Sequence, residues 1–162
     1  MGLRIGPAAA TLALLATPAA AQSVKLSGLA GQQAKVTAQD LATMPRVAVT
    51  LQLEGGRSEA CEGVALADLL QKVGAPQGKA LRGPEMADVV LIGAADGYRA
   101  ALALAETDAL MTAKKVVLAD RCNGAPMTPP EGPFRLVVEG DLRPARSARQ
   151  VTDVAVRRVS AP

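Results

Sequence analysis

Cys61 and Cys122 are the side chains best suited to chemistry in this 162-residue sequence. A cysteine thiolate is a nucleophile and a soft metal ligand, whereas an even number of cysteines in an oxidising compartment favours a disulfide. The two cysteines lie far apart in the sequence, so they lack the Cys-x-x-Cys spacing of a dithiol redox motif. A disulfide, two buried thiols and a redox pair all remain open at this point.

The chain begins with the pattern of a secretory signal peptide. Arg4 supplies a positive charge, residues 8–16 are apolar, and Ala19-Ala20-Ala21 fits the small-residue cleavage rule. We therefore expect residues 1–21 to be removed and the mature protein to be periplasmic or secreted. The apolar run is shorter than the ~20 residues of a spanning helix, so no membrane span is expected after cleavage. The leader has no Arg-Arg pair, which favours general secretory over twin-arginine export.

Composition excludes several classes of site. Histidine is absent, so we expect no histidine metal ligand, general base or catalytic triad. Tyr98 and Phe134 are the only aromatic side chains, which argues against a site that stacks bases or sugars. The overall charge is only mildly positive, so nucleic-acid binding is not expected. Several arginines near the C-terminal end could form an anion or protein docking surface, although a solvated face is the simpler interpretation: Arg143, Arg146, Arg149, Arg157 and Arg158.

The residues that could take part in chemistry must be positioned by short strands and a few short helices. Alternating or continuous apolar runs predict strands at residues 24–27, 34–36, 46–53, 88–94, 115–120, 134–138 and 151–159. Helical spacing and end signals predict helices at residues 38–43 and 66–73, and a short helix or irregular segment at 102–111. Because strands and helices do not alternate regularly, the pattern indicates the α+β class in one domain, residues 22–162.

The stretch from residue 47 to residue 70 is the predicted joint between a strand and a helix. We expect a charged, glycine-rich loop between them, with Cys61 in that loop. Loops on a rigid scaffold often carry binding and catalytic residues. This joint is therefore the first place to look for a site.

Six segments of the sequence resemble the oxidoreductase molybdopterin-binding domain family, to which the central domain of sulfite oxidase belongs. They occur in the family's order and cover nearly the whole chain after residue 21. The resemblance implies a mixed-sheet α+β fold with a few short helices. The segments are Thr50-Leu51-Gln52, Gly63 to Leu70, Asp96-Gly97-Tyr98, Asn123 to Pro126, Gly132 to Val138, and Arg149 to Thr152.

For active members, the resemblance also implies a molybdenum ion held by a pterin dithiolene and by one protein cysteine thiolate, a ligand that suits soft metals. Leu53 stands where that cysteine is expected, and Cys61 lies well beyond it. Gly56 and Ser58 replace an asparagine and an arginine of the usual motif. The missing histidine and the missing Arg-Arg pair point the same way, because many members bind the pterin phosphate through histidine and are exported folded.

We therefore expect a pseudoenzyme that keeps the fold without a molybdenum cofactor. It would act as a binding or accessory protein for an unknown protein partner or a small anionic ligand. Residues 54–58 would be the floor of the former cofactor pocket, with Arg57 and Tyr98 as its binding residues and no metal ligand. Cys61 and Cys122 would form a disulfide. The alternatives are an active molybdopterin-dependent oxidoreductase with Cys61 as ligand, and a structural subunit of a periplasmic redox or signalling complex.

Three further residues have simple structural interpretations. Asp96 should bond its own backbone in a tight turn. Tyr98 could point its phenol into a cleft, but a core anchor with a hydrated hydroxyl is the simpler expectation. Arg135 lies on an apolar strand and needs an acidic partner, for which Glu131 and Asp120 are the candidates.

Overall fold

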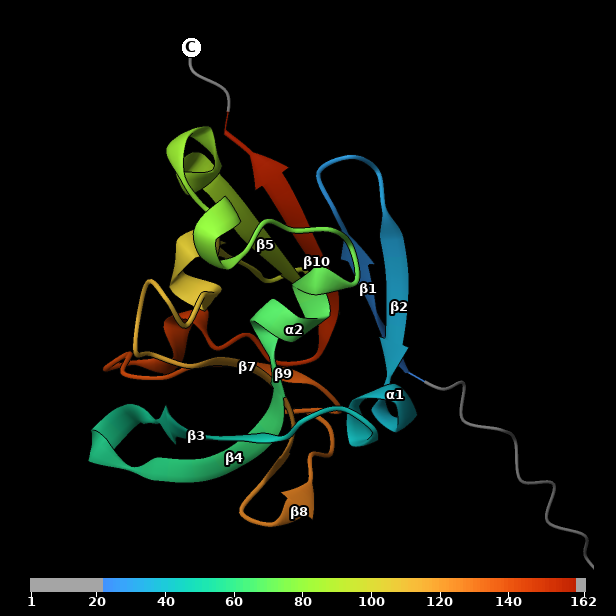
Figure 1. Ribbon diagram of the computed structural model, residues 1–162. Helices are drawn as coiled ribbons and strands as arrows, with labels where there is room; N and C mark the ends of the chain where they lie inside the picture. Colours follow the sequence, from blue (N-terminus) through green and yellow to red (C-terminus); the bar gives the residue numbers. More distant parts are fainter. Residues whose placement is uncertain (1–21, 160–162) are drawn as a thin grey trace, which may run out of the picture.

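The computed structural model describes residues 22–159, which form two β-sheets and two short α-helices (Figure 1). The predicted signal peptide lies outside these residues and stays a prediction. Within residues 22–159, no helix has the length and apolar character needed to cross a bilayer. The strands are β1 (Ser23–Ser27), β2 (Gln33–Thr37), β3 (Val47–Gln52), β4 (Ser58–Ala65), β5 (Asp88–Ala94), β6 (Arg99–Ala103), β7 (Val116–Cys122), β8 (Ala125–Pro126), β9 (Arg135–Val138) and β10 (Val151–Arg158), and the helices are α1 (Ala38–Ala42) and α2 (Leu66–Gln71).

The first sheet joins the two ends of the described chain. Its order is β2-β1-β10-β5-β6, with β1 and β10 parallel and the other neighbours antiparallel. The parallel pair brings Leu26 opposite Val154, although the two residues are distant in the sequence. The mixed sheet and the few short helices confirm the predicted α+β class.

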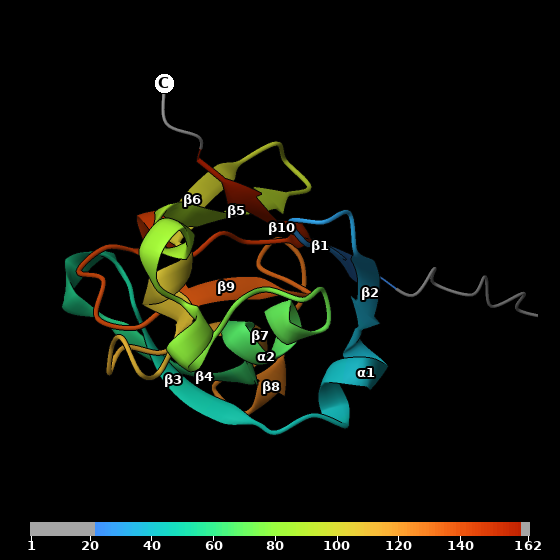
Figure 2. The same cartoon turned by 45° about the horizontal axis from the view of Figure 1, so that its top comes forward.

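The second sheet is built from the middle of the chain. Its order is β3-β4-β7-β8, and β9 also pairs with β7. In Figures 1 and 2, β3 and β4 lie on the opposite side of the molecule from β5 and β6. The two sheets therefore enclose the space in which the main core forms.

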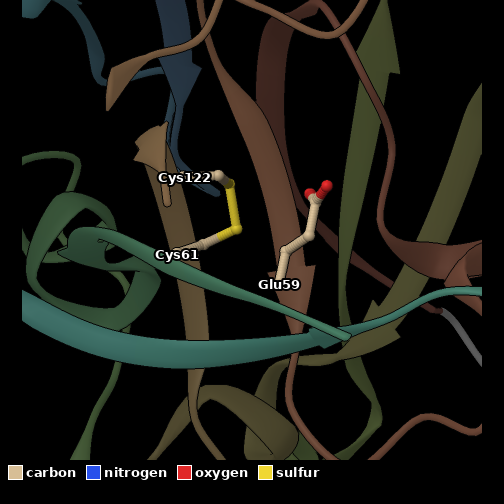
Figure 3. Close-up of side chains that lie close together, drawn as sticks. All are labelled: Glu59, Cys61 and Cys122. Carbon is tan, nitrogen blue, oxygen red and sulfur yellow. A yellow bond between two sulfur atoms is a disulfide. The ribbon is translucent and has the colours of Figure 1, made fainter. Parts of the chain in front are cut away.

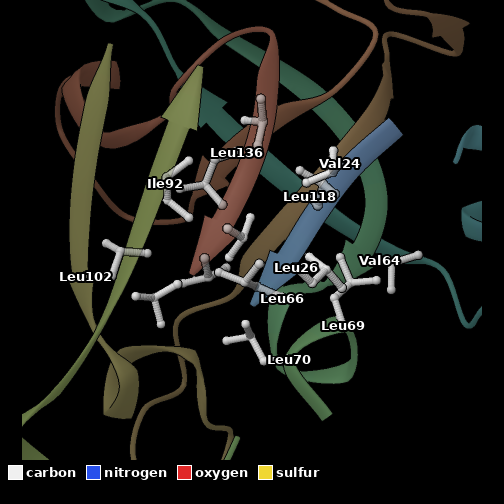
Figure 4. Close-up of a cluster of buried hydrophobic side chains, with 14 of the residues drawn as sticks. Val24, Leu26, Val64, Leu66, Leu69, Leu70, Ile92, Leu102, Leu118 and Leu136 are labelled. Atoms are coloured by element: carbon white, nitrogen blue, oxygen red, sulfur yellow. The ribbon is translucent and has the colours of Figure 1, made fainter. Parts of the chain in front are cut away.

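Helix α2 fills part of the space between the sheets. Leu66, Leu69 and Leu70 are fully buried there, which confirms the helical stripe read from the sequence. They meet Leu26 of β1 and Leu118 of β7 in the main hydrophobic cluster (Figure 4). Burying each such side chain contributes about 1.5–3 kcal/mol, so this cluster is what joins the two sheets.

Helix α1 begins as its sequence predicts. The Asp40 N–H donates to the Thr37 hydroxyl, and the Thr37 N–H donates to the Asp40 carboxylate. This reciprocal capping satisfies amide groups that a helix start leaves without partners. The hydrogen bonds from Thr37 lower the pKa of the Asp40 carboxyl.

The predicted loop at residues 54–63 is wrong in most of its length. A short 3-10 turn, Glu54–Gly56, is followed directly by β4, which pairs with β3 on one side and β7 on the other. The polar side chains of β4 are exposed or half-buried, so its composition resembles that of a loop. Backbone pairing on both sides, which local sequence does not reveal, decides its structure.

Residues 102–111 agree in part with the expected short helix or irregular segment, except that Leu102 and Ala103 end a strand. The alanine-rich stretch Arg99–Ala103 is β6, an edge strand, and a 3-10 turn at Leu104–Thr107 follows it. Alanine has a high helix propensity, but pairing with β5 and burial of Leu102 override it.

Candidate functional site

The two cysteines face each other across neighbouring strands. Cys61 of β4 lies opposite Cys122 of β7, and their sulfurs form a disulfide with Cα atoms 4.0 Å apart (Figure 3). The predicted pairing is confirmed. Cys61 therefore belongs to a strand and has no free thiolate in this state.

A first hollow lies at the turn between β3 and β4. Its volume is about 590 Å³, and the residues that line it come from the turn and from a second loop. The turn contributes Gln52, Leu53, Glu54, Gly55 and Gly56, and the second loop contributes Gly140, Leu142 and Arg143. Glu54, Gly55 and Gly56 of the predicted floor line this hollow, and its role as a former cofactor pocket stays a prediction. Leu53, at the position the family resemblance gives to the metal ligand, presents an apolar side chain there.

The glycines give this turn its shape. Gly55 and Gly56 have φ values of +73° and +75°, in the left-handed region that favours glycine. The Leu53 N–H donates to the Arg57 carbonyl at 2.8 Å and closes the turn. Arg57 is exposed, and its Nε reaches only the Glu54 carbonyl at 3.5 Å. Arg57 therefore lies at the turn but lines neither this hollow nor the one beside it.

A second hollow of about 370 Å³ adjoins the first, because Glu54 and Arg143 line both. Its other residues include Tyr98, Arg135 and Arg149. Three guanidinium groups therefore lie on its walls. We refer to the two adjoining hollows as the basic groove.

Tyr98 lines the groove and is not the core anchor that we expected. It is 46% exposed and follows the tight turn at Asp96-Gly97. The Tyr98 N–H donates to the Asp96 carboxylate at 2.9 Å, as predicted for that turn. Its hydroxyl donates to the Ala145 carbonyl at 2.6 Å and so ties the turn to the far wall.

Arg135 is the most deeply buried charge of the groove. Its side chain is 3% exposed and pairs with Glu131, one of the two predicted candidates, while the other candidate, Asp120, pairs with Arg46. Glu131 also holds Arg149 at 3.1 Å. Among the described residues, no group accepts a hydrogen bond from the buried Arg135 Nε. Burial lowers the pKa of the Arg135 guanidinium, and Glu131 opposes that effect.

A network of ion pairs holds the loop that forms the far wall. Arg146 binds both oxygens of Asp141, at 2.9 and 2.7 Å, and reaches Glu106 at 2.9 Å. These hydrogen bonds raise the pKa of Arg146. The network fixes the loop that carries Arg143 and Arg149, and it leaves Arg143 in no ion pair within residues 22–159.

The groove has the chemistry of an anion receptor. Guanidinium groups present several N–H donors in a plane that matches carboxylate, phosphate and sulfate oxygens. Sequence reasoning noted the arginine-rich stretch around Arg143 and Arg149 but favoured a solvated face. It could not show that this stretch folds against the β3–β4 turn and Tyr98.

Comparisons with known proteins identify the family. Residues 14–162 match the model of the oxidoreductase molybdopterin binding domain family, so the chain belongs to that family. Among solved structures, it is similar to the sulfane dehydrogenase SoxCD from Paracoccus pantotrophus, with a TM-score of 0.60 and 21% identity. The likeness covers 86% of this chain and 39% of that one, and it shows the shared fold. No curated protein matches the sequence.

The donor atoms of this chain do not fit the metal of that family. The expected protein ligand is a cysteine thiolate, and both cysteines of the chain are used in the disulfide. Leu53 cannot replace a thiolate, because its side chain has no donor atom. Cys61 lines neither hollow of the basic groove.

Proposed function

We propose that the protein is an exported member of the molybdopterin-binding domain family that has lost the molybdenum ligand and acts as a binding or accessory protein. Its ligand is a small anion held in the basic groove. Leu53 carries this proposal, because it presents an apolar side chain in the groove at the position where the resemblance expects a thiolate.

The charge of the groove supports an anionic ligand. Arg143 has no acidic partner among the described residues, and Arg135 has a buried N–H without an acceptor. A buried donor without a partner costs about 1–3 kcal/mol, which an incoming oxygen atom would recover. The Tyr98 hydroxyl and the amides of the glycine turn add neutral polar groups beside the arginines.

The family match favours a second candidate, a molybdopterin-dependent oxidoreductase with an atypical ligand. It requires Cys61 to leave the disulfide and to reach the groove from a strand position that does not line it. In this case Cys61→Ser would abolish retention of the cofactor. Under the first proposal, the same substitution leaves the molybdenum content unchanged.

Calorimetric titration with sulfate and with phosphate at low ionic strength tests the anion site. We expect saturable binding of one anion per chain. Arg143→Ala and Arg149→Ala should each weaken it roughly five-fold, the effect of losing about 1 kcal/mol from a partly exposed ionic hydrogen bond.

Two variants serve as matched controls. Arg157→Ala removes an exposed charge on β10 whose side chain hydrogen-bonds the Val156 carbonyl and lines neither hollow, so anion affinity should not change. Arg57→Ala removes a charge at the β3–β4 turn that lines neither hollow, and we expect the same result. A specific anion site would be excluded if Arg143→Ala and Arg157→Ala lost the same anion affinity, or if the protein showed no saturable anion binding.

A further inference from the structure

We propose that Cys61 and Cys122, once a dithiol opens their disulfide, form a binding site for monovalent copper together with the thioether of Met127. None of these three residues lines the basic groove, and the site does not rest on the proposed function, although Arg135 borders both the groove and the hollow beside the disulfide. In the oxidised protein both cysteine sulfurs belong to the disulfide, so the site cannot bind the ion.

Three sulfur atoms already converge at this end of the second sheet. The Met127 Sδ lies 3.7 Å from the Cys122 Sγ, and Cys122 is bonded to Cys61. Glu59 precedes Cys61 by two residues on β4, and its side chain lies beside the disulfide (Figure 3). A Glu59 carboxylate oxygen and the two cysteine sulfurs lie within 4.8 Å of one another. Two thiolates and a thioether suit a soft cation, and the carboxylate adds negative charge beside it.

The backbone holds the two cysteines opposite each other without help from the S–S bond. Asn123 donates its N–H to the Ala60 carbonyl at 2.7 Å, and its side-chain oxygen accepts from the Ala60 N–H at 3.3 Å. The Met127 N–H donates to the Asp120 carbonyl at 3.0 Å, which fixes Met127 beside β7. The sulfur atoms should therefore stay close after reduction.

The disulfide is accessible from one side. A hollow of about 190 Å³ is lined by Cys122, Met127 and Glu59, whereas Cys61 is 3% exposed and does not line it. A thiolate of the dithiol attacks the Cys122 Sγ, the S–S bond breaks, and Cys61 leaves with the electron pair and takes up a proton. The second thiol of the reductant then displaces Cys122, and the reductant becomes a disulfide. Binding of Cu⁺ releases the thiol protons.

The test is a titration of the reduced, reductant-free protein with Cu⁺ under anaerobic conditions, in competition with a coloured Cu⁺ chelator. Ag⁺ serves as a probe that does not change its oxidation state. We expect one ion per reduced chain and none for the oxidised protein. Met127→Leu should weaken binding about ten-fold, whereas Met111→Leu, at an exposed methionine, should leave it unchanged.

An amide NMR spectrum of the reduced protein keeps the result interpretable. A native-like spectrum with one bound ion and a selective effect of Met127→Leu supports the site. Equal binding by oxidised protein, equal affinities of Met127→Leu and Met111→Leu, or loss of the native spectrum on reduction would each overturn it. The variant Cys61→Ser should bind no Cu⁺ in competition with the chelator, and retention of full affinity would also overturn the proposal.

Discussion

Arg135 carries the largest electrostatic cost of any single residue in the groove. Its guanidinium is almost completely removed from water, and within residues 22–159 Glu131 is the one acidic group that pairs with it. A buried charge without its partner costs several kcal/mol, so the orientation of Glu131 matters more than its partial exposure suggests. Glu131 also binds Arg149, and it therefore sets the position of two arginines at once.

Glu131→Gln should lower the free energy of unfolding by about 2 kcal/mol. This value is below that of a fully buried pair, because Glu131 is 38% exposed in its side chain and solvent screens part of the interaction. Urea denaturation at neutral pH measures it. Glu85→Gln, whose Arg158 partner lies 3.5 Å away and is largely exposed, is the matched control and should change stability much less. Equal effects of the two substitutions would contradict the role of burial.

Residue types alone placed Glu131 among the two candidate partners of Arg135 and favoured a disulfide between the two cysteines, and the structure shows both pairings. They favoured a buried position for Tyr98 over the pocket position that the family resemblance gave, because aromatic residues are usually buried, whereas Tyr98 is 46% exposed. Arg143 was missed as a groove residue for a related reason. Arg143 lies beside the β3–β4 turn, which is far away in the sequence. Local sequence patterns do not show that these two segments are neighbours.

At the scale of elements, the loop after β9 gives the groove its far wall. The Arg146 network with Asp141 and Glu106 fixes it, since the loop has only a short 3-10 turn, Pro144–Arg146, of its own. Burial alone would raise the pKa of Glu106, but hydrogen bonds from Arg146 and from the Ala103 N–H outweigh it and lower that pKa.

Stability should depend on this network in acid. Because the folded state lowers the pKa of Glu106 below its ordinary value of 4.5, its contribution is present above that pH and is lost as the pH falls further. Glu106→Gln should therefore cost about 1 kcal/mol at pH 7 and much less near pH 3. Denaturation curves of both proteins at the two pH values measure this loss of unfolding free energy. An equal loss at pH 7 and pH 3 would exclude a stabilising role for the Glu106 charge.

Arg146→Met should loosen the far wall without unfolding the sheets. We expect faster hydrogen exchange at Ser147 and Ala148, whose amides bond within the loop, and unchanged exchange at Val154 in the centre of β10. Amide exchange followed by NMR measures both. Faster exchange throughout β10 would show instead that Arg146 supports the whole fold.

The elements with clear periodicity were the ones that sequence could predict. The stripe of α2, the cap of α1 and the apolar runs of β5 and β10 all depend on nearby residues. β4 was misread as a loop and β6 was not predicted, because strand pairing overrules their polar and alanine-rich sequences. The sequence pointed to residues 54–58 at the floor of the groove, but it did not point to the loop after β9 as the far wall.

At the scale of the whole molecule, the fold depends on contacts between distant segments. The first sheet joins β1 to β10, and the disulfide bridges β4 and β7 across 61 residues. Closing a loop of that length restricts the unfolded chain. The double variant Cys61→Ala, Cys122→Ala should therefore lose about 2–4 kcal/mol of stability in urea denaturation. An unchanged midpoint would mean that the disulfide does not stabilise the fold.

Metal analysis combined with thiol counting shows whether the protein provides a thiolate ligand for molybdenum. The protein is purified from its native host without reductant, and its molybdenum and its free thiols are measured after denaturation. We expect molybdenum far below one ion per chain, no free thiol before reduction, and two thiols afterwards, matching the two cysteines of the sequence. Close to one molybdenum per chain, together with free thiols before reduction, would contradict it.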